Sequence, residues 1–485
     1  MGNYDFIMDT EELRTMNKLT GMRQGKRTLS VFLVLLLCFS MGMSVAATDM
    51  ELLTPEEQQA QQEMERLYGL PIQTNELSGW PQGPGTYGEA GIVMEVGSGA
   101  ILYAKNIDDH HYPASITKTL TTLVAMENSE LDDKVTFSAD SLSFLEWGDA
   151  AIGMQEGDVI SMEEALYAVL LASANEVSYA VAESIGKSKG HDYSWYIDLM
   201  NTRCQELGGM NSHFVNPHGL HDENHYTCAR DMALIGRALF KYPVVFDIMQ
   251  SMQYTIEESD TTMEHIFQQN HKMFYMDNMY YWEDVIGGKT GYTDQSRNTL
   301  VTMTDNGDMQ LVCVVLRTEG YNVYSDTRNL CEYVYDNFEK LDVAKLEKSE
   351  DVGKIITKDG GGYVVVPDGV TFEMLKMELT PDKDVKGEAV LTYTYEGNNV
   401  GEVRAKLSDT FLKENPDLAP EKESGEDAKT GSNKAGKMGR NKTENRILAV
   451  SVVILILLIG TLLRYVMKKK REKKRRRRRM EMNRK

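Results

Sequence analysis

Two uncharged apolar runs near the ends of the chain confine the part of it that can fold as a globular body. The first run, 29–39, follows three basic residues and precedes small residues at 44–47. A positive flank, a short apolar region and an Ala-x-Ala-like site are typical of a secretory signal peptide. We therefore expect residues 1–46 to be a signal peptide with an extended N-terminal region. A membrane-spanning helix is the alternative, but the run is shorter than the ~20 residues that a span needs.

The second run, 447–463, predicts a transmembrane helix over residues 447–467. Leu, Ile and Val dominate the run, and Arg464 and Tyr465 can extend the span at the interface. The tail that follows, 468–485, has 13 basic and 2 acidic residues and so carries +11. Basic residues beside a span stay on the cytoplasmic side. We expect a single-pass protein of the cell membrane with an extracytoplasmic body and a cytoplasmic tail that contacts anionic lipid.

The rest of the chain is acidic, and this excludes one class of partner. The 485-residue sequence has 52 Lys and Arg against 73 Asp and Glu, a net charge of −21 despite the basic tail. A nucleic-acid-binding surface needs clustered Lys and Arg to contact phosphates, so we expect no nucleic-acid partner. The five cysteines form no Cys-x-x-Cys pair, which removes the usual zinc and redox signatures.

Hydrophobic periodicity divides the exported body into an α/β domain over 88–345 and a small β-rich domain over 346–409. Residues 47–87 are polar and predict a leader, and residues 410–446 predict a flexible spacer before the membrane. The elements expected in the α/β domain are a β-hairpin from 92–94 and 101–103, helices over 116–126, 162–185, 231–240 and 329–341, and paired strands over 299–303 and 311–316. A catalytic function would require a nucleophile, a base and an oxyanion site within this body.

The first candidate catalytic motif is Ser-Ile-Thr-Lys at 115–118. Ser115 and Lys118 are three residues apart at the start of an expected helix, so both lie on one face and the amine can reach the hydroxyl. A desolvated Lys can take the proton of a Ser hydroxyl and turn it into a nucleophile. The pattern alone is weak, because Ser-Ile-Gly-Lys at 184–187 matches it equally well.

Two further motifs accompany such a Ser-x-x-Lys pattern in penicillin-interacting enzymes, a Ser-x-Asn and a Lys-Thr-Gly. Ser-Ala-Asn occurs at 173–175, inside the expected helix over 162–185, and Lys-Thr-Gly occurs at 289–291, in front of the strand pair. A second Lys-Thr-Gly, at 429–431, falls in the polar spacer. The ordered triple, with each member in a fitting local structure, indicates a serine acyl-transfer site.

With these motifs the sequence resembles the low-molecular-mass penicillin-binding D-alanyl-D-alanine carboxypeptidases of the peptidase S11 family. The resemblance covers about 91–341 and includes the segments 112–118, 171–175, 216–220 and 288–293. It implies a penicillin-binding or serine β-lactamase-like α/β (α+β) domain with an antiparallel sheet and a helical cluster, followed by a small all-β domain. The sequence departs from the pattern at Glu176, because most relatives have Asp-Ala after the Asn and this chain has Glu-Val.

The resemblance also implies a role for each motif residue. The chain would remove the terminal D-alanine from peptidoglycan stem peptides through an acyl-enzyme, β-lactam antibiotics would inhibit it, and no cofactor or metal is implied. The implied roles are Ser115 as nucleophile, Lys118 as general base, Ser173 as proton relay, Asn175 as ligand of the substrate amide, Lys289, Thr290 and Gly291 as the carboxylate-binding residues, and the backbone N–H groups of Ser115 and Tyr292 as the oxyanion hole.

Four other interpretations are open at this point. Gly-Lys-Ser-Lys-Gly at 186–190 matches the nucleophile-elbow pattern of α/β-hydrolases, although it follows an expected helix rather than a strand. His218, His221 and His225 could hold a metal, although their spacing is not that of a His-Glu-x-x-His site. A serine β-lactamase would use the same triple with fast deacylation. A surface module could also keep the fold without the chemistry.

Overall fold

The computed structural model describes residues 54–357 and 361–420 of the chain. The expected signal peptide, transmembrane helix and basic tail lie outside these residues. Within the described ranges, no helix is both long enough and apolar enough to cross a membrane.

A five-stranded antiparallel sheet organises the α/β domain, in the order β2-β1-β9-β8-β7. Its strands are β1 (Ala90–Glu95), β2 (Ile101–Lys105), β7 (Val285–Thr293), β8 (Arg297–Asp305) and β9 (Gln310–Thr318). Both expected hairpins are confirmed, because β1 pairs with β2 and β8 pairs with β9 in antiparallel register. The order leaves β7, which carries the Lys-Thr-Gly motif, at one edge of the sheet.

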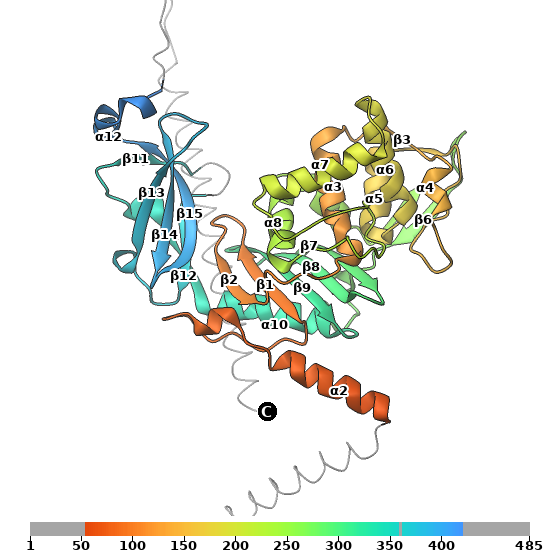
Figure 1. Ribbon diagram of the computed structural model, residues 1–485, viewed down its shortest axis with the longest axis horizontal. Helices are drawn as coiled ribbons and strands as arrows, with labels where there is room; N and C mark the ends of the chain where they lie inside the picture. The colour runs from red at the N-terminus through yellow and green to blue at the C-terminus, as the bar shows by residue number, and fades with distance from the viewer. Residues whose placement is uncertain (1–53, 358–360, 421–485) are drawn as a thin grey trace, which may run out of the picture. The chain divides into compact units, whose positions relative to one another are not determined.

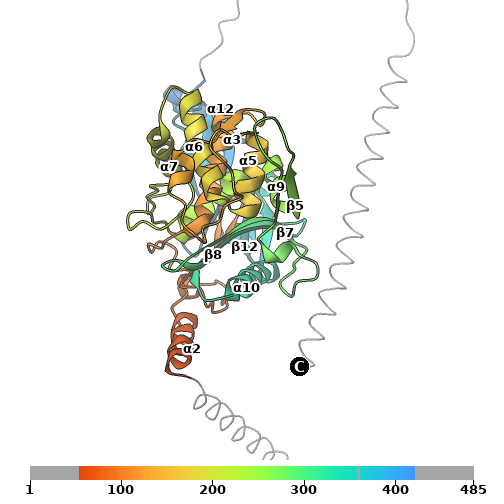
Figure 2. The same ribbon diagram turned by 90° about the vertical axis from the view of Figure 1, so that its right-hand side faces the viewer.

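Helices cover both faces of this sheet, which explains why its strands are apolar on both sides. In Figures 1 and 2 one face carries a cluster of helices and the opposite face carries α10 (Asn322–Asn337). The cluster consists of α3 (Lys118–Asn128), α5 (Met162–Tyr167), α6 (Asn175–Ser188), α7 (Tyr193–Glu206), α8 (Ala229–Leu239) and α9 (Pro243–Gln250). Neighbouring β1 residues bury into different cores, Ile92 into that of the cluster and Val93 into that of α10.

The prediction of one continuous helix over 162–185 is wrong. The chain forms α5, then a π-helical turn over Ala168–Ala172, and then breaks at Ser173, whose φ of 62° is left-handed. A new helix, α6, begins at Asn175. Apolar periodicity could not reveal the break, because the turn and both flanking helices contribute buried residues to the same core.

Two other helix boundaries differ from prediction. The helix expected over 116–126 begins with a 3-10 turn, Ala114–Thr117, and continues as α3. The helix expected over 329–341 is α10, which begins earlier and ends at Asn337 because β10 (Phe338–Asp342) follows and pairs with β12 (Tyr363–Pro367). The helix expected over 231–240 is confirmed as α8.

The described part of the expected polar leader is folded. Helix α2 (Pro55–Tyr68) begins with a capping box between Thr54 and Glu57. The side chain of Trp80 is buried and its indole N–H donates to the carbonyl of Leu102 on β2 at 3.2 Å. These residues belong to the α/β domain because they pack against its edge strand.

The β-rich character predicted for 346–409 is confirmed. A second sheet has the order β11-β15-β14-β13. Its strands are β11 (Val352–Ile355), β13 (Lys376–Pro381), β14 (Glu388–Tyr395) and β15 (Asn398–Leu407). The spacer expected from 410 begins differently, because Ser408 caps a short helix, α12 (Asp409–Glu414).

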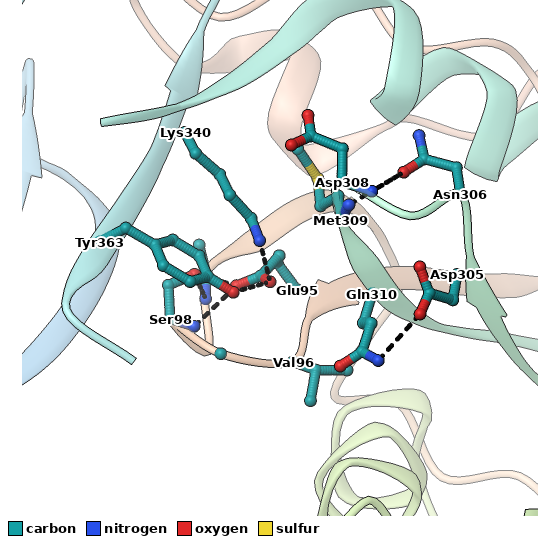
Figure 3. A network of polar contacts seen from close by, with 12 residues as sticks. Glu95, Val96, Ser98, Asp305, Asn306, Asp308, Met309, Gln310, Lys340 and Tyr363 are labelled. Atoms are coloured by element: carbon teal, nitrogen blue, oxygen red, sulfur yellow. Dashed lines mark hydrogen bonds and ion pairs between the residues drawn. The ribbon is translucent and has the colours of Figure 1, made fainter. Parts of the chain in front are cut away.

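A buried carboxylate joins the two domains. Glu95 at the end of β1 is fully buried, and one of its oxygens accepts from the hydroxyl of Tyr363 on β12 at 2.6 Å (Figure 3). The other oxygen accepts from the backbone N–H and the hydroxyl of Ser98 at 2.7 and 2.6 Å. The ammonium of Lys340 lies 4.0 Å from Glu95 and 3.8 Å from the centre of the Tyr363 ring. This network satisfies a charge that would otherwise be costly to bury.

Candidate active site

The first motif places a serine and a lysine in contact at the start of α3. Ser115 lies in the 3-10 turn Ala114–Thr117 and is partly exposed, while Lys118 is the first residue of the helix and is fully buried. The Nζ atom of Lys118 lies 3.1 Å from Oγ of Ser115. The spacing of three residues therefore produces the contact that the sequence predicted.

Two acceptors from distant segments complete the surroundings of Lys118. Its Nζ donates to Oδ1 of Asn175 at 2.7 Å and to the carbonyl oxygen of His218 at 2.6 Å. Burial lowers the pKa of Lys118 well below its usual value, and the positive charge of Lys289 lowers it further. A lysine that loses its proton readily can accept the proton of Ser115, because the neutral amine is a base.

The second and third motifs meet through another buried lysine. Lys289 on β7 donates from Nζ to Oγ of Ser173 at 2.9 Å and to the carbonyl of Thr290 at 2.9 Å. Burial lowers the pKa of Lys289 to about 7. The left-handed conformation of Ser173 breaks the helix at the point where its hydroxyl contacts the edge strand. Each of the two serines thus contacts one buried lysine: Ser115 contacts Lys118 and Ser173 contacts Lys289.

Strand β7 brings the Lys-Thr-Gly motif against the turn that carries Ser115. A Cβ atom added to Gly291 would lie 3.0 Å from the backbone nitrogen of Ser115 and 2.4 Å from the hydroxyl of Thr299. Gly291 is therefore needed for this close approach. Thr290 is partly exposed and Tyr292 is 55% exposed, so both border solvent at the edge of the sheet. The two expected oxyanion-hole donors, the N–H groups of Ser115 and Tyr292, belong to these facing segments.

The loop 216–220 makes contacts with the site, although the sequence predicted no role for its residues. Besides the carbonyl of His218, it contains Gly219 with a φ of +86°. A Cβ atom there would lie 1.9 Å from the carbonyl oxygen of Ala114, beside the nucleophile. The only signal in the sequence was the resemblance of this segment to the family, because a backbone acceptor has no side-chain signature.

Glu176, where the sequence departs from the family pattern, binds the loop 150–153 beside the site. It is fully buried, and its Oε1 accepts from the N–H groups of Ile152 and Gly153 at 2.7 and 3.2 Å. The N–H of the preceding Asn175 donates to the carbonyl of Ala150 at 2.8 Å. Burial raises the pKa of Glu176. The first turn of α6 therefore holds the loop 150–153 and Lys118 together.

The competing Ser-x-x-Lys pattern at 184–187 does not form a catalytic pair. The hydroxyl of Ser184 accepts from the N–H of Thr136 at 3.1 Å. Lys187 pairs instead with Glu183 at 2.9 Å and its side chain is 61% exposed. Residues 186–190, which matched the nucleophile-elbow pattern, form the end of α6 and the turn after it rather than a strand-to-helix turn.

The three histidines considered as metal ligands have different partners. The ring of His221 lies edge-on to Tyr112, with 4.6 Å between centroids, and His218 stacks on Phe144 at 4.7 Å. His225 is buried and contacts the hydroxyl of Thr117. Over the residues that the structure describes, no group of three His, Cys, Asp or Glu side chains could hold a metal ion.

The fold and this site define a serine hydrolase of the penicillin-binding class. The family model for D-alanyl-D-alanine carboxypeptidase, peptidase S11, matches residues 81–320. The chain is 26% identical over 350 residues to D-alanyl-D-alanine carboxypeptidase DacF of Bacillus subtilis, covering 69% of this chain and 85% of that one. It is also 26% identical to DacA of Haemophilus influenzae, covering 65% of this chain and 83% of the relative. The chain belongs to the D-alanyl-D-alanine carboxypeptidase family.

Solved structures show the same fold. Penicillin binding protein 5 from Haemophilus influenzae superposes with a TM-score of 0.54 at 24% identity, covering 68% of this chain and 98% of that one. The D-alanyl-D-alanine carboxypeptidase DacD from Francisella tularensis superposes with a TM-score of 0.52 at 20% identity, covering 68% and 94%. The expectation of a penicillin-binding α/β fold with an antiparallel sheet is therefore confirmed.

Proposed function

We propose that this chain is a serine-type D-Ala-D-Ala carboxypeptidase that removes the terminal D-alanine from peptidoglycan stem peptides. The observation that carries the proposal is the position of the Lys118 amine, which lies 3.1 Å from the Ser115 hydroxyl and is held there by Asn175 and His218. A nucleophile, a desolvated base and a fixed geometry between them are the requirements for acyl transfer.

Acylation follows from these contacts. Lys118 takes the proton of Ser115 as Oγ attacks the carbonyl carbon between the two D-alanines. The N–H groups of Ser115 and Tyr292 stabilise the negative oxygen of the tetrahedral intermediate. When the C–N bond breaks, Ser173 relays the proton that Lys118 took from Ser115 to the leaving amine, and free D-alanine departs. Water then hydrolyses the ester and restores the hydroxyl of Ser115.

Substrate binding uses the edge strand and the start of α6. Lys289 as an ammonium and the hydroxyl of Thr290 bind the terminal carboxylate, and Gly291 lets the strand approach Ser115 closely. Asn175 uses Oδ1 to hold Lys118, so its amide NH₂ is the donor for a substrate carbonyl. β-Lactams mimic the scissile amide and inhibit the enzyme because Ser115 opens the lactam ring and forms an ester with its carbonyl carbon.

Labelling with a fluorescent penicillin tests the mechanism on the full-length chain. We expect wild type to be labelled in a 1:1 ratio and to release D-alanine from a pentapeptide ending in D-Ala-D-Ala. Ser115→Ala abolishes both, while Ser184→Ala, in the competing Ser-x-x-Lys pattern, leaves both unchanged. Labelling of the Ser115→Ala variant would contradict the proposal. Rapid turnover of penicillin, in place of a persistent adduct, would instead favour a β-lactamase.

We also propose that the enzyme is anchored in the cell membrane by residues 447–467, with the body outside and the basic tail inside. The support is the apolar run and the charge that follows it in the sequence. An epitope after Lys485 is expected to resist protease added outside intact cells, whereas the body is digested. Digestion of the epitope in intact cells would contradict this topology.

A further inference from the structure

A buried series of hydrogen bonds runs from the loop 215–225 to the residue before the nucleophile. The N–H of Val215 donates to Nδ1 of His225 at 3.1 Å. Nε2 of His225 lies 2.8 Å from the hydroxyl of Thr117, and that hydroxyl donates to the carbonyl of Ala114 at 2.9 Å. Ala114, Thr117 and His225 are all buried. The catalytic steps described above do not use this series.

The direction of every bond in the series is determined by its first member. A backbone N–H can only donate, so Nδ1 of His225 is the acceptor and Nε2 carries the ring proton. Nε2 therefore donates to Thr117, whose own hydroxyl proton is free to go to Ala114. Burial lowers the pKa of His225 to about 3, so the ring is neutral at physiological pH.

The end of the series is a strained residue. Ala114 has a φ of +52°, a left-handed conformation that costs a residue with a Cβ atom roughly 1–2 kcal/mol. Such strain persists only where the surroundings hold it in place. Here the hydroxyl of Thr299 donates to the carbonyl of Pro113 at 2.8 Å, and Gly219 packs directly on the carbonyl of Ala114. The bond from Thr117 is the third restraint, and it acts on the carbonyl itself.

Holding this carbonyl also aims a catalytic group. The carbonyl of Ala114 and the N–H of Ser115 belong to one planar peptide, and no described peptide bond is cis. In a planar trans peptide the C=O and N–H point in opposite directions. Whatever fixes the carbonyl of Ala114 therefore fixes the direction of the Ser115 N–H, the first oxyanion donor of the proposed reaction.

We propose that His225 is a positioning residue that acts through Thr117 to aim the Ser115 N–H at the substrate oxygen. This inference rests on the proposed function, because it assigns His225 and Thr117 to the oxyanion hole of that reaction. It also gives a role to a histidine that the sequence offered as a metal ligand. Neither side chain touches the substrate, so both act on the rate of acylation rather than on binding.

Thr117→Val is the central variant, because it keeps the shape of threonine and removes the hydroxyl. Loss of an oxyanion donor lowers rates by about 10²–10³, so we expect misaiming it to slow acylation by at least about 10-fold. The dissociation constant of the non-covalent penicillin complex should stay within about threefold of wild type. Thr117→Ser keeps the hydroxyl and should acylate within about threefold of wild type.

A matched pair at His225 provides an independent test. His225→Gln can place an amide NH₂ where Nε2 lies and should acylate close to the wild-type rate, whereas His225→Leu cannot donate and should be as slow as Thr117→Val. All rates are measured on the full-length chain by stopped-flow with fluorescent penicillin, and are expressed per site labelled at completion. A purely structural role would reduce the number of labelled sites without changing the rate per site.

The outcomes separate this inference from the proposed function. Labelling of Ser115→Ala would overturn the function itself. The function stands if Ser115→Ala is unlabelled. In that case the positioning role is wrong if Thr117→Val acylates as fast as Thr117→Ser, or if His225→Leu acylates as fast as His225→Gln. The positioning role is supported if Thr117→Val and His225→Leu acylate slowly while Thr117→Ser and His225→Gln acylate close to the wild-type rate.

Discussion

The Nζ atom of Lys289 lies 2.9 Å from Oγ of Ser173, although 116 residues separate the two in the chain. The contact depends on two local features. Ser173 occupies a left-handed break between two helices, and Lys289 lies on the edge strand of the sheet. With Lys118 held by Asn175, two residues after Ser173, the same short segment positions both catalytic lysines.

Lys118→Arg should abolish the base while keeping a hydrogen-bond donor at this position. Arginine does not lose its proton in proteins, so it cannot accept the proton of Ser115. General base catalysis contributes about 10²–10⁴ in rate, and we expect the acylation rate with penicillin to fall by at least about 10²-fold. Lys187→Arg, in the competing motif, is the matched control and should acylate normally. A Lys118→Arg variant within about tenfold of wild type would argue against Lys118 as the base.

Binding of the terminal carboxylate should weaken as the pH rises through about 7, the pKa of Lys289. Below that pH Lys289 is an ammonium that attracts the carboxylate, and above it the amine is neutral. We expect kcat/KM for a D-Ala-D-Ala peptide, divided by that for the same peptide with a C-terminal amide, to fall across this range. The ratio cancels the titration of Lys118, which acts on both substrates.

Lys289→Arg is the control for this pH dependence, because arginine stays protonated throughout. In this variant the ratio of the kcat/KM values for the two substrates should not change with pH, whatever its absolute size. The assignment fails if wild type shows a flat ratio, or if the variant keeps the wild-type fall.

Glu176→Ala should release the loop 150–153 from the first turn of α6. The variant removes the acceptor for the N–H groups of Ile152 and Gly153, and unpaired buried donors cost about 1–3 kcal/mol of unfolding free energy. Amide hydrogen exchange at Ile152 and Gly153 should accelerate, and penicillin acylation should slow because Asn175 is adjacent. Unchanged exchange at both amides would show that the carboxylate does not hold the loop.

Glu176→Gln tests the charge separately from the bonds. Glutamine can still accept from both N–H groups, so exchange should remain slow. Because burial raises the pKa of Glu176 above 4.5, the folded state binds more protons than the unfolded state in the range between the two pKa values. Wild-type stability should therefore fall as the pH rises through that range. In Glu176→Gln this fall should be absent in urea unfolding.

Lys105→Met should destabilise the attachment of the segment before β1. The ammonium of Lys105 is fully buried and donates to the carbonyls of Leu67, Thr86 and Gly88 at 2.7, 2.7 and 2.8 Å. Hydrogen bonds to a charged group contribute about 1.5–3 kcal/mol each, so we expect a loss of more than about 2 kcal/mol in urea unfolding. Limited proteolysis should cut near Tyr68 first.

The exposed Lys187→Met provides the comparison and should change stability by less than about 0.5 kcal/mol. Equal stabilities of Lys105→Met and Lys187→Met would mean that the buried contacts of Lys105 contribute nothing net. Early cleavage elsewhere, with residues 54–87 still protected, would show that Lys105 does not hold this segment.

Local patterns in the sequence were enough for several parts of the fold. Alternation and turn residues correctly indicated the β1–β2 and β8–β9 hairpins and the β-rich domain, because strand pairing across a short turn depends on neighbouring residues. The Ser115–Lys118 contact was also predictable, since one helical turn separates the two residues. The folding of the segment 54–87 was not predictable, because its few buried apolar residues pack against distant segments, as Trp80 does against Phe338 of β10.

The sequence by itself determined which side chains are available for catalysis, their order along the chain, and the family to which their motifs belong. Only the tertiary structure decided which of two Ser-x-x-Lys patterns is buried beside Asn175, where the helix breaks at Ser173, and that His225 contacts Thr117. These outcomes depend on burial and on backbone acceptors such as the carbonyl of His218. The burial of a particular side chain and the position of a backbone acceptor cannot be predicted from residue type or spacing, because both arise when distant segments pack together.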